Sequence, residues 1–223
     1  MKRVLLLACA MTAPLWSADP LDEVLGTLDA AAASFRGMSA DLKQIAHTGA
    51  INEDNVEAGT IRMKRSKPGD TRMRVDFTVP DPKTVILEAQ KLQIFLPKAA
   101  IVQEYDLGKS RDLIEQFLLL GFGTSRKDLS ASNSVRYIGT EEIGGENTSK
   151  LELIPRAKDV QQRIQKIELW LSAAGYPKQD KLYQPGGDYQ LLIFSNLKIN
   201  PPLPDSSLQL KLPKGVKKEY PQR

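Results

Sequence analysis

Few residues in this sequence could carry out chemistry, and none of them stands in a recognisable catalytic pattern. The single histidine, His47, lies at the end of a predicted strand, and no Gly-x-Ser-x-Gly motif supplies a nucleophile for it to activate. The acidic pairs Asp22-Glu23 and Glu141-Glu142 fall on the polar face of a predicted helix and in a predicted turn, which does not favour a catalytic pair of carboxylates. We therefore expect a protein that is not an enzyme, with His47 in a structural or exposed position.

The sequence also gives no sign of a metal, cofactor or nucleic-acid site. Its one cysteine, Cys9, lies near the N-terminus, and Gly121-Phe-Gly123 follows a predicted helix, whereas a phosphate-binding loop opens one. The 31 basic and 27 acidic residues give a net charge of +4, or 29 − 27 = +2 without Lys2 and Arg3, which is too small to indicate nucleic acid. The basic runs at residues 62–74 and 211–218 are interpreted as solvated strand faces and a tail. Contact with an acidic partner or with anionic headgroups is the alternative.

The N-terminus is typical of an exported protein. Lys2 and Arg3 precede an apolar stretch over residues 4–16 and the small residues Ser17 and Ala18, which predicts a secretory signal peptide too short to span a bilayer. With cleavage near Ala18, residues 1–18 are the signal peptide and residues 19–223 a single domain. Residues 6–9 (LLAC) resemble a lipobox, so lipidation of Cys9 is the alternative, although few apolar residues precede it.

Beyond the signal peptide, the apolar pattern predicts one helix followed by a sheet. Asp19 and Pro20 form a helix start, and apolar residues at a spacing of three and four predict an amphipathic helix over residues 20–35. From Ser39 onward the period is two. In residues 71–78 the apolar side chains alternate with charged ones, which predicts an antiparallel sheet with one buried face and one solvated face.

Short strands are expected through the rest of the chain, separated by turns rich in Gly and Pro. Their predicted ranges are 59–65, 71–78, 83–88, 92–96, 101–105, 135–141, 150–154, 164–172, 177–184 and 189–198. Residues 110–122 break this pattern, because their apolar side chains have helical spacing and are too many for one exposed face. Such a helix could plug the open side of a curved sheet. Periodicity alone does not separate a packed core from a cavity for an apolar ligand.

Four segments resemble the LolA-type family of lipoprotein carriers. MSADLKQ at 38–44, AGTIRMKR at 58–65 and TRMRVDFTVPDP at 71–82 are similar to the first half of that family, and LQLKLPKGV at 208–216 is similar to its terminal strand. Their order matches over nearly all of the mature chain. The resemblance implies an α+β fold: an incomplete, half-open antiparallel β-barrel of about 10–11 strands, with an N-terminal helix and a mid-chain lid helix over the concave face.

The resemblance also implies a set of site residues. We expect a lipid-binding cavity on the concave face, lined by Met63, Met73, Val75, Phe77, Leu92, Ile94, Leu96, Ile167, Leu169, Leu171, Leu191 and Ile193. We expect Leu113, Ile114, Phe117 and Leu118 to form the lid. In this family an arginine of a Lys-Arg-Pro motif tethers the lid through backbone carbonyls. Arg65 matches it, although Ser66 and Lys67 separate it from Pro68, and Arg72 and Arg74 are the alternatives.

The function implied is that of a carrier in the periplasm of a Gram-negative-type bacterium. It would bind acyl chains of lipoproteins, or another lipid, and ferry them toward the outer membrane, since each methylene sheltered from water is worth about 0.8 kcal/mol. An inner-membrane transporter and an outer-membrane acceptor are the partners expected by resemblance, and we expect a monomer. The alternative is a lipid-responsive periplasmic sensor that binds a membrane protein partner, as in RseB-type relatives. A hydrolase using His47 or Glu141 is the third hypothesis.

Overall fold

The computed structural model describes residues 19–66, 70–108 and 120–222, and most of them belong to strands. The strands are β1 (Gly37–Thr48), β2 (Glu53–Arg65), β3 (Thr71–Val79), β4 (Lys83–Glu88), β5 (Lys91–Leu96), β6 (Ile101–Asp106), β7 (Asn133–Ile143), β8 (Glu146–Pro155), β9 (Lys166–Leu171), β10 (Pro177–Tyr183), β11 (Tyr189–Ile199) and β12 (Lys217–Glu219). Short 3-10 helices occur at η1 (Pro97–Ala99), η3 (Pro185–Gly187) and η4 (Asp205–Ser207).

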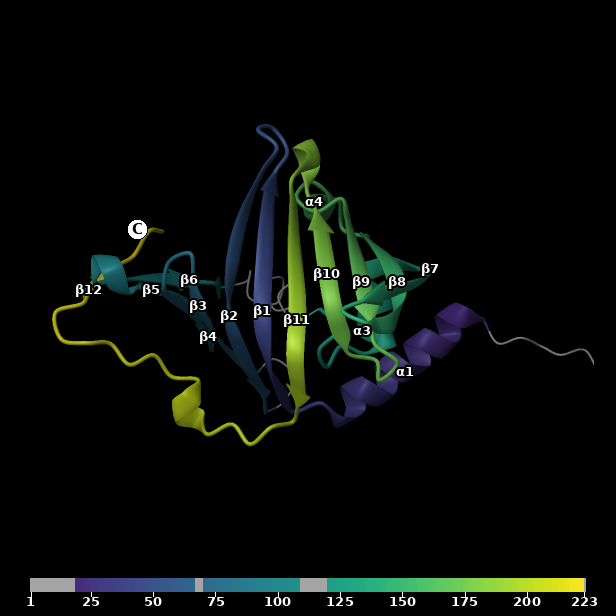
Figure 1. Ribbon diagram of the computed structural model, residues 1–223, viewed down its shortest axis with the longest axis horizontal. Helices are drawn as coiled ribbons and strands as arrows, with labels where there is room; N and C mark the ends of the chain where they lie inside the picture. The colour runs from purple at the N-terminus through teal and green to yellow at the C-terminus, as the bar shows by residue number, and fades with distance from the viewer. Residues whose placement is uncertain (1–18, 67–69, 109–119, 223) are drawn as a thin grey trace, which may run out of the picture.

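All of these strands form one open, curved sheet (Figure 1). Its order is β12-β6-β5-β4-β3-β2-β1-β11-β10-β9-β8-β7, and neighbouring strands are antiparallel except β12, which runs parallel to β6. The pairing of β1 with β11 joins the two halves of the chain at the centre of the sheet. The expected half-open antiparallel barrel is therefore confirmed, with twelve strands in the described ranges where ten or eleven were expected.

The N-terminal helix α1 (Pro20–Ser34) forms where the sequence predicts it. The side chain of Asp19 caps it by accepting a 3.0 Å hydrogen bond from the backbone N–H of Leu21, and Pro20 occupies the first turn. Leu25, Leu28 and Ala31 are its buried residues, at the three- and four-residue spacing of one helix face. This face packs against the sheet beside β8 and β9.

The sheet has two faces of different character. On β3 the side chains of Met73, Val75 and Phe77 are buried, whereas Arg72 before them and Arg74 between them are partly exposed on the other side. We call the face that carries Met73, Val75 and Phe77 the inner face and the opposite one the outer face. The alternation of β3 is the one predicted from its sequence, because successive side chains of a strand point to opposite faces.

Two short helices, α3 (Arg126–Ser132) and α4 (Lys158–Gln161), were not predicted. They span 7 and 4 residues, which is too short for an apolar period to be recognised. Ser125 caps α3 by accepting a 3.2 Å hydrogen bond from the N–H of Asp128. Arg126 then binds Asp29 of α1 through its backbone N–H and its Nε, at 2.7 and 2.8 Å, so α3 is held against α1.

The C-terminal segment 200–216 crosses the outer face before it reaches β12 (Figure 1). Leu208 is buried there, and the backbone oxygen of Gln209 accepts a 2.6 Å hydrogen bond from Nη1 of Arg74. The expectation that residues 208–216 form a terminal strand is wrong, because Gln209 is bound to Arg74 of the outer face and none of these residues belongs to a strand. Pairing begins only at Lys217, opposite Ile101. Within the described ranges, no helix has the length and apolar character that crossing a membrane requires.

Candidate functional site

The inner face carries two clusters of buried apolar side chains. Cluster I lies over β1 to β4 and β11 and consists of Phe35, Met38, Ala40, Leu42, Ile61, Met63, Met73, Val75, Phe77, Leu87, Leu107, Phe122, Leu192 and Phe194. Cluster II lies between the helices α1 and α3 and the strands β8 to β10. It consists of Leu25, Leu28, Leu120, Leu129, Leu151, Leu153, Ile164, Ile167, Leu169, Leu171 and Leu182. Together they make most of the inner face apolar.

Most of the predicted cavity residues lie on this face. Cluster I contains Met63, Met73, Val75 and Phe77, and cluster II contains Ile167, Leu169 and Leu171. Leu92 packs against cluster I. Ile94 and Leu96 are half-buried on the same face, since Ile94 pairs with Val85 and Val85 pairs with Val75. The structure thus brings these ten side chains to one face, and their contact with lipid stays a prediction.

Leu191 and Ile193 lie on the outer face, so the prediction of which β11 side chains point inward (the phase of the strand) is wrong. The buried residues of this strand are Leu192 and Phe194, and Phe194 pairs with Leu42 of β1. Residues 191–194 are four successive apolar residues, so no polar alternation marks which of them point inward. The register with β1 sets the phase instead.

Three aromatic side chains contact one another within cluster I, and no pattern in the sequence predicts this contact. The ring of Phe122 stands edge-on to that of Phe194, with centroids 5.2 Å apart, and lies 6.0 Å from that of Phe35. These three residues come from segments far apart in the chain, so no local pattern could reveal their contact. The side chain of Trp170 instead lies on the outer face of the sheet, where its indole N–H donates a 2.9 Å hydrogen bond to Glu141.

The segment 120–123 connects the two clusters. Leu120 belongs to cluster II and Phe122 to cluster I, and both are about 2% exposed. Gly121 between them has a φ of +81°, and a Cβ atom there would lie 2.6 Å from Cγ of Pro177. A glycine is therefore needed for this close approach to β10. The predicted lid residues Leu113, Ile114, Phe117 and Leu118 fall on residues 109–119, outside the described ranges.

Arg65 holds the end of this connecting segment. Its Nη1 donates a 2.5 Å hydrogen bond to the backbone oxygen of Gly123, and its Nε is buried without a hydrogen-bond partner among the described residues. A cavity of about 420 Å³ surrounds the contact, lined by Ala32, Phe35, Arg36, Arg65, Ser66, Gly123 and Asp128. Arg65 thus binds a backbone carbonyl in the segment that follows residues 109–119, and its role as a lid tether stays a prediction.

The two alternative tether residues lie on the outer face and bind other groups. Arg72 contacts Asp205 at 3.3 Å, and Arg74 binds Asp76 and the backbone oxygen of Gln209. Burial tends to raise the pKa of Asp76, but the hydrogen bonds from Arg74 and Thr84 outweigh it and lower that pKa below 3.8. Within the basic run at residues 62–74, carboxylate partners on the outer face or in the C-terminal segment are thus found for Arg62, Lys64, Arg72 and Arg74.

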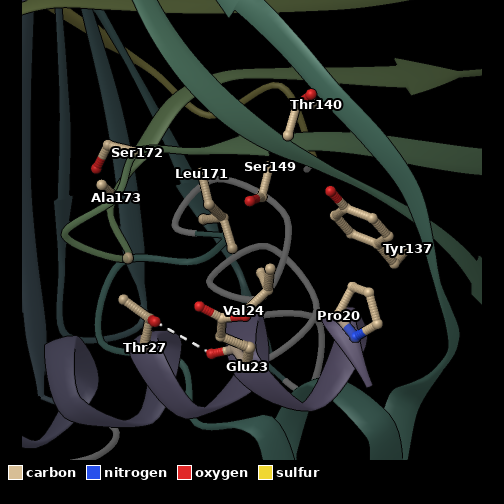
Figure 2. Close-up of a pocket in the computed structure, with 11 residues that line it drawn as sticks. Pro20, Glu23, Val24, Thr27, Tyr137, Thr140, Ser149, Leu171, Ser172 and Ala173 are labelled. Atoms are coloured by element: carbon tan, nitrogen blue, oxygen red, sulfur yellow. Dashed lines mark hydrogen bonds between the residues drawn. The ribbon is translucent and has the colours of Figure 1, made fainter. Parts of the chain in front are cut away.

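A second cavity, of about 330 Å³, lies between the first half of α1 and the strands β7, β8 and the end of β9 (Figure 2). This volume is at the lower end of the roughly 300–1,000 Å³ that small-molecule sites occupy. Val24 and Leu171 are its main apolar walls. Most of the other lining residues carry a hydroxyl or a charge, and the full set is Pro20, Glu23, Thr27, Tyr137, Thr140, Ser149, Ser172, Ala173 and Gly175. Because Leu171 belongs to cluster II, the cavity adjoins the inner face at the β7 end of the sheet.

The residues considered as possible catalytic groups lie far apart in the sheet. His47 lies on β1, where its Nδ1 is 2.7 Å from Asp54 and its ring stacks on Tyr189. Glu141 lies on β7, with four strands between β7 and β1 in the sheet order, and its carboxylate is bound by Trp170 and Lys150. In the described part of the chain, no group of three or more His, Cys, Asp or Glu side chains is arranged to hold a metal ion.

Residues 33–211 match the model of the family described as outer membrane lipoprotein carrier protein LolA. No curated protein sequence matches the chain.

Among solved structures, MucB shares the fold, with a TM-score of 0.55 and 18% identity over 88% of this chain and 64% of MucB. An uncharacterized conserved protein from Thermus thermophilus gives 0.55 and 12% identity over 91% and 99% of the two chains. The lipoprotein LppX from Mycobacterium tuberculosis gives 0.51 and 12% over 84% and 99%. At these identities the similarity concerns the fold.

Proposed function

Since this chain belongs to the LolA family of outer membrane lipoprotein carriers, we propose that it is a periplasmic carrier for acyl chains of lipoproteins or of another lipid. One observation carries this proposal: the inner face holds two apolar clusters that the segment 120–123 connects, and Arg65 holds that segment through one hydrogen bond. Acyl chains are sheltered from water by such a face without covalent chemistry, because burying hydrocarbon is favourable by itself.

The proposed binding site extends the predicted cavity by the residues that the tertiary structure adds. It takes in the ten predicted residues on the inner face together with Leu192, Phe194 and Phe122. Leu113, Ile114, Phe117 and Leu118 remain the proposed lid, and Arg65 its tether. Ligand entry would then have to break the hydrogen bond from Arg65 to Gly123, which is worth about 1.5–3 kcal/mol for a charged donor, and to separate the apolar surfaces that pack around the connecting segment.

The proposed location and partners follow from the same family membership. Residues 1–18 would direct export and be removed near Ala18. The carrier would then receive its cargo from an inner-membrane transporter and deliver it to an outer-membrane acceptor. N-terminal sequencing of protein recovered from the periplasm tests this: a start near Asp19 supports it, and a chain that keeps its first 18 residues in the cytoplasm contradicts it.

Native mass spectrometry of the full protein purified from the periplasm tests the carrier function. We expect a mass increment equal to one or more bound lipids, lost in the double variant Phe117→Asp, Leu118→Asp. Ile138→Asp serves as the control, because Ile138 is already 48% exposed on β7. Wild-type protein that carries no lipid, and takes up none from added lipid, contradicts the carrier function. Unchanged loading of the double variant contradicts only the lid.

The second candidate function is a lipid-responsive sensor that binds a membrane protein partner. It is supported by the fold shared with MucB, but the similarity spans only 64% of that chain at 18% identity. Affinity capture from detergent-solubilised membranes separates the two candidates. A sensor would be recovered with one inner-membrane regulator, and a carrier with transporter and acceptor components.

A further inference from the structure

The side chain of Asp180 places a carboxyl group in the middle of the apolar inner face. It lies on β10 opposite Leu169 of β9 and Leu192 of β11. Leu182, two residues further along the same strand, belongs to cluster II, so the side chain of Asp180 points to the inner face as well. The residue is 1% exposed.

This carboxyl lacks the hydrogen bonding that the chain gives to comparable groups. Its Oδ1 has no partner among the described residues. By contrast, the buried Asn133 donates to the backbone oxygen of Leu129 at 3.1 Å, and the buried Thr148 donates to that of Glu141 at 2.6 Å. Burial raises the pKa of Asp180 well above 3.8, which favours the protonated carboxyl. A buried polar atom left unpaired is unfavourable, and its presence needs a reason.

The position of Asp180 suggests that reason. Leu192 on one side belongs to cluster I, and Leu169 on the other belongs to cluster II, so the carboxyl stands where the two clusters meet. Pro177, at the start of the same strand, lies against Gly121 of the connecting segment. A chain-like apolar ligand lying across both clusters would therefore run past Asp180 below that segment.

We propose that Asp180 is a specificity residue, which hydrogen-bonds the ester or amide linkage that joins an acyl chain to its head group. The inference rests on the proposed function and adds a ligand feature that an apolar surface cannot recognise. A protonated carboxyl offers one O–H donor and an acceptor oxygen, and a linkage carbonyl accepts while an amide N–H donates. A plain hydrocarbon makes neither bond and leaves the carboxyl unpaired.

The test compares a chain-matched pair of probes, hexadecanamide and hexadecane, in displacing an environment-sensitive apolar dye from the full protein. We expect Asp180→Leu to weaken displacement by hexadecanamide about tenfold, equivalent to about 1.4 kcal/mol, and to leave hexadecane unchanged or stronger. Asp180→Asn keeps a donor and an acceptor and should retain most of the affinity for the amide. Asp41→Leu, at an exposed outer-face carboxyl of β1, is the control and should affect neither probe.

The outcomes separate the inference from the function on which it rests. If wild-type protein binds neither probe, the proposed function fails. If it binds both and Asp180→Leu shifts both equally or not at all, only the role of Asp180 is overturned. The same variants tested with a triacylated cysteinyl lipopeptide and with a lysophospholipid identify the natural source of the linkage. Affinity for the true source should fall in Asp180→Leu, and no fall with either overturns the inference.

Discussion

Arg65 and Gly123 are joined by a 2.5 Å hydrogen bond although they lie 58 residues apart in the chain. The contact links the end of β2 to the segment that bridges the two apolar clusters. Gly123 has a φ of +69°, and a Cβ atom there would lie 2.6 Å from Nη1 of Arg65 and 2.8 Å from Phe35. The bond thus depends on the absence of a side chain at position 123.

Arg65→Ala should loosen the connecting segment without unfolding the sheet. A hydrogen bond to a charged group contributes about 1.5–3 kcal/mol, so we expect the backbone amides of residues 120–123 to exchange with solvent at least tenfold faster. Hydrogen–deuterium exchange on the purified protein measures this. Arg72→Ala is the matched control, since Arg72 binds Asp205 on the outer face. Equal exchange in both variants would show that Arg65 does not restrain the segment.

Gly121→Ala should destabilise the fold more than Gly145→Ala. Both glycines have a φ of +81°, so both alanines meet the same backbone strain of about 1–2 kcal/mol. Only at position 121 does the added Cβ meet a neighbour, Pro177 Cγ at 2.6 Å, whereas nothing lies within 4 Å at position 145. We expect a further loss of about 1–3 kcal/mol for Gly121→Ala, measured as a lower urea midpoint. Equal urea midpoints would contradict the prediction and show that Pro177 can move to make room for the added methyl group.

The phase of β11 can be checked with two adjacent leucines. Leu192→Ala removes a side chain that is 8% exposed within cluster I and should cost about 2–5 kcal/mol in the free energy of unfolding. Leu191→Ala, on the outer face, should cost less than half as much. Chemical denaturation of the two variants in parallel decides between the phases, and a larger loss for Leu191→Ala would restore the phase predicted from the sequence.

Asp180 should make the fold less stable as the pH rises. Because burial raises its pKa well above 3.8 and its cross-strand neighbours Leu169 and Leu192 carry no charge, the folded state keeps a proton that the unfolded chain releases. The stabilisation linked to this proton is complete below about pH 3.8 and is lost as the pH rises toward the raised pKa of the folded state.

Asp180→Asn removes this linkage while keeping the size of the side chain. We expect the free energy of unfolding of the variant to gain on that of the wild type as the pH rises from about 3.8 toward the raised pKa of Asp180, measured by denaturation at a series of pH values. Groups such as Asp76, whose pKa is lowered, act in the opposite sense at acid pH, but they are the same in both proteins and cancel in the difference. A difference that does not change with pH would contradict the linkage.

Local pattern determined much of this protein by itself. Asp19, Pro20 and the leucine spacing after them set α1, and the strict alternation of Met73, Val75 and Phe77 with charged residues set both the extent and the inward face of β3. Such segments can be predicted from the sequence because polar and apolar residues occupy different faces of the same helix or strand. The spacing of the apolar residues therefore indicates which face is buried. The order of these elements was also enough to indicate the family.

Tertiary structure decided which side chains face the inner side of the sheet and which residues contact one another, because these features depend on pairing between strands. Because residues 191–194 of β11 are all apolar, their sequence does not show which of them point inward, and the pairing with β1 determines it. The contacts among Phe35, Phe122 and Phe194 come from segments remote in the chain. The position of Asp180 between Leu169 and Leu192 comes from the register of three consecutive strands. The sequence shows which side chains are apolar or charged, but only the sheet register determines which of them face one another across the inner face.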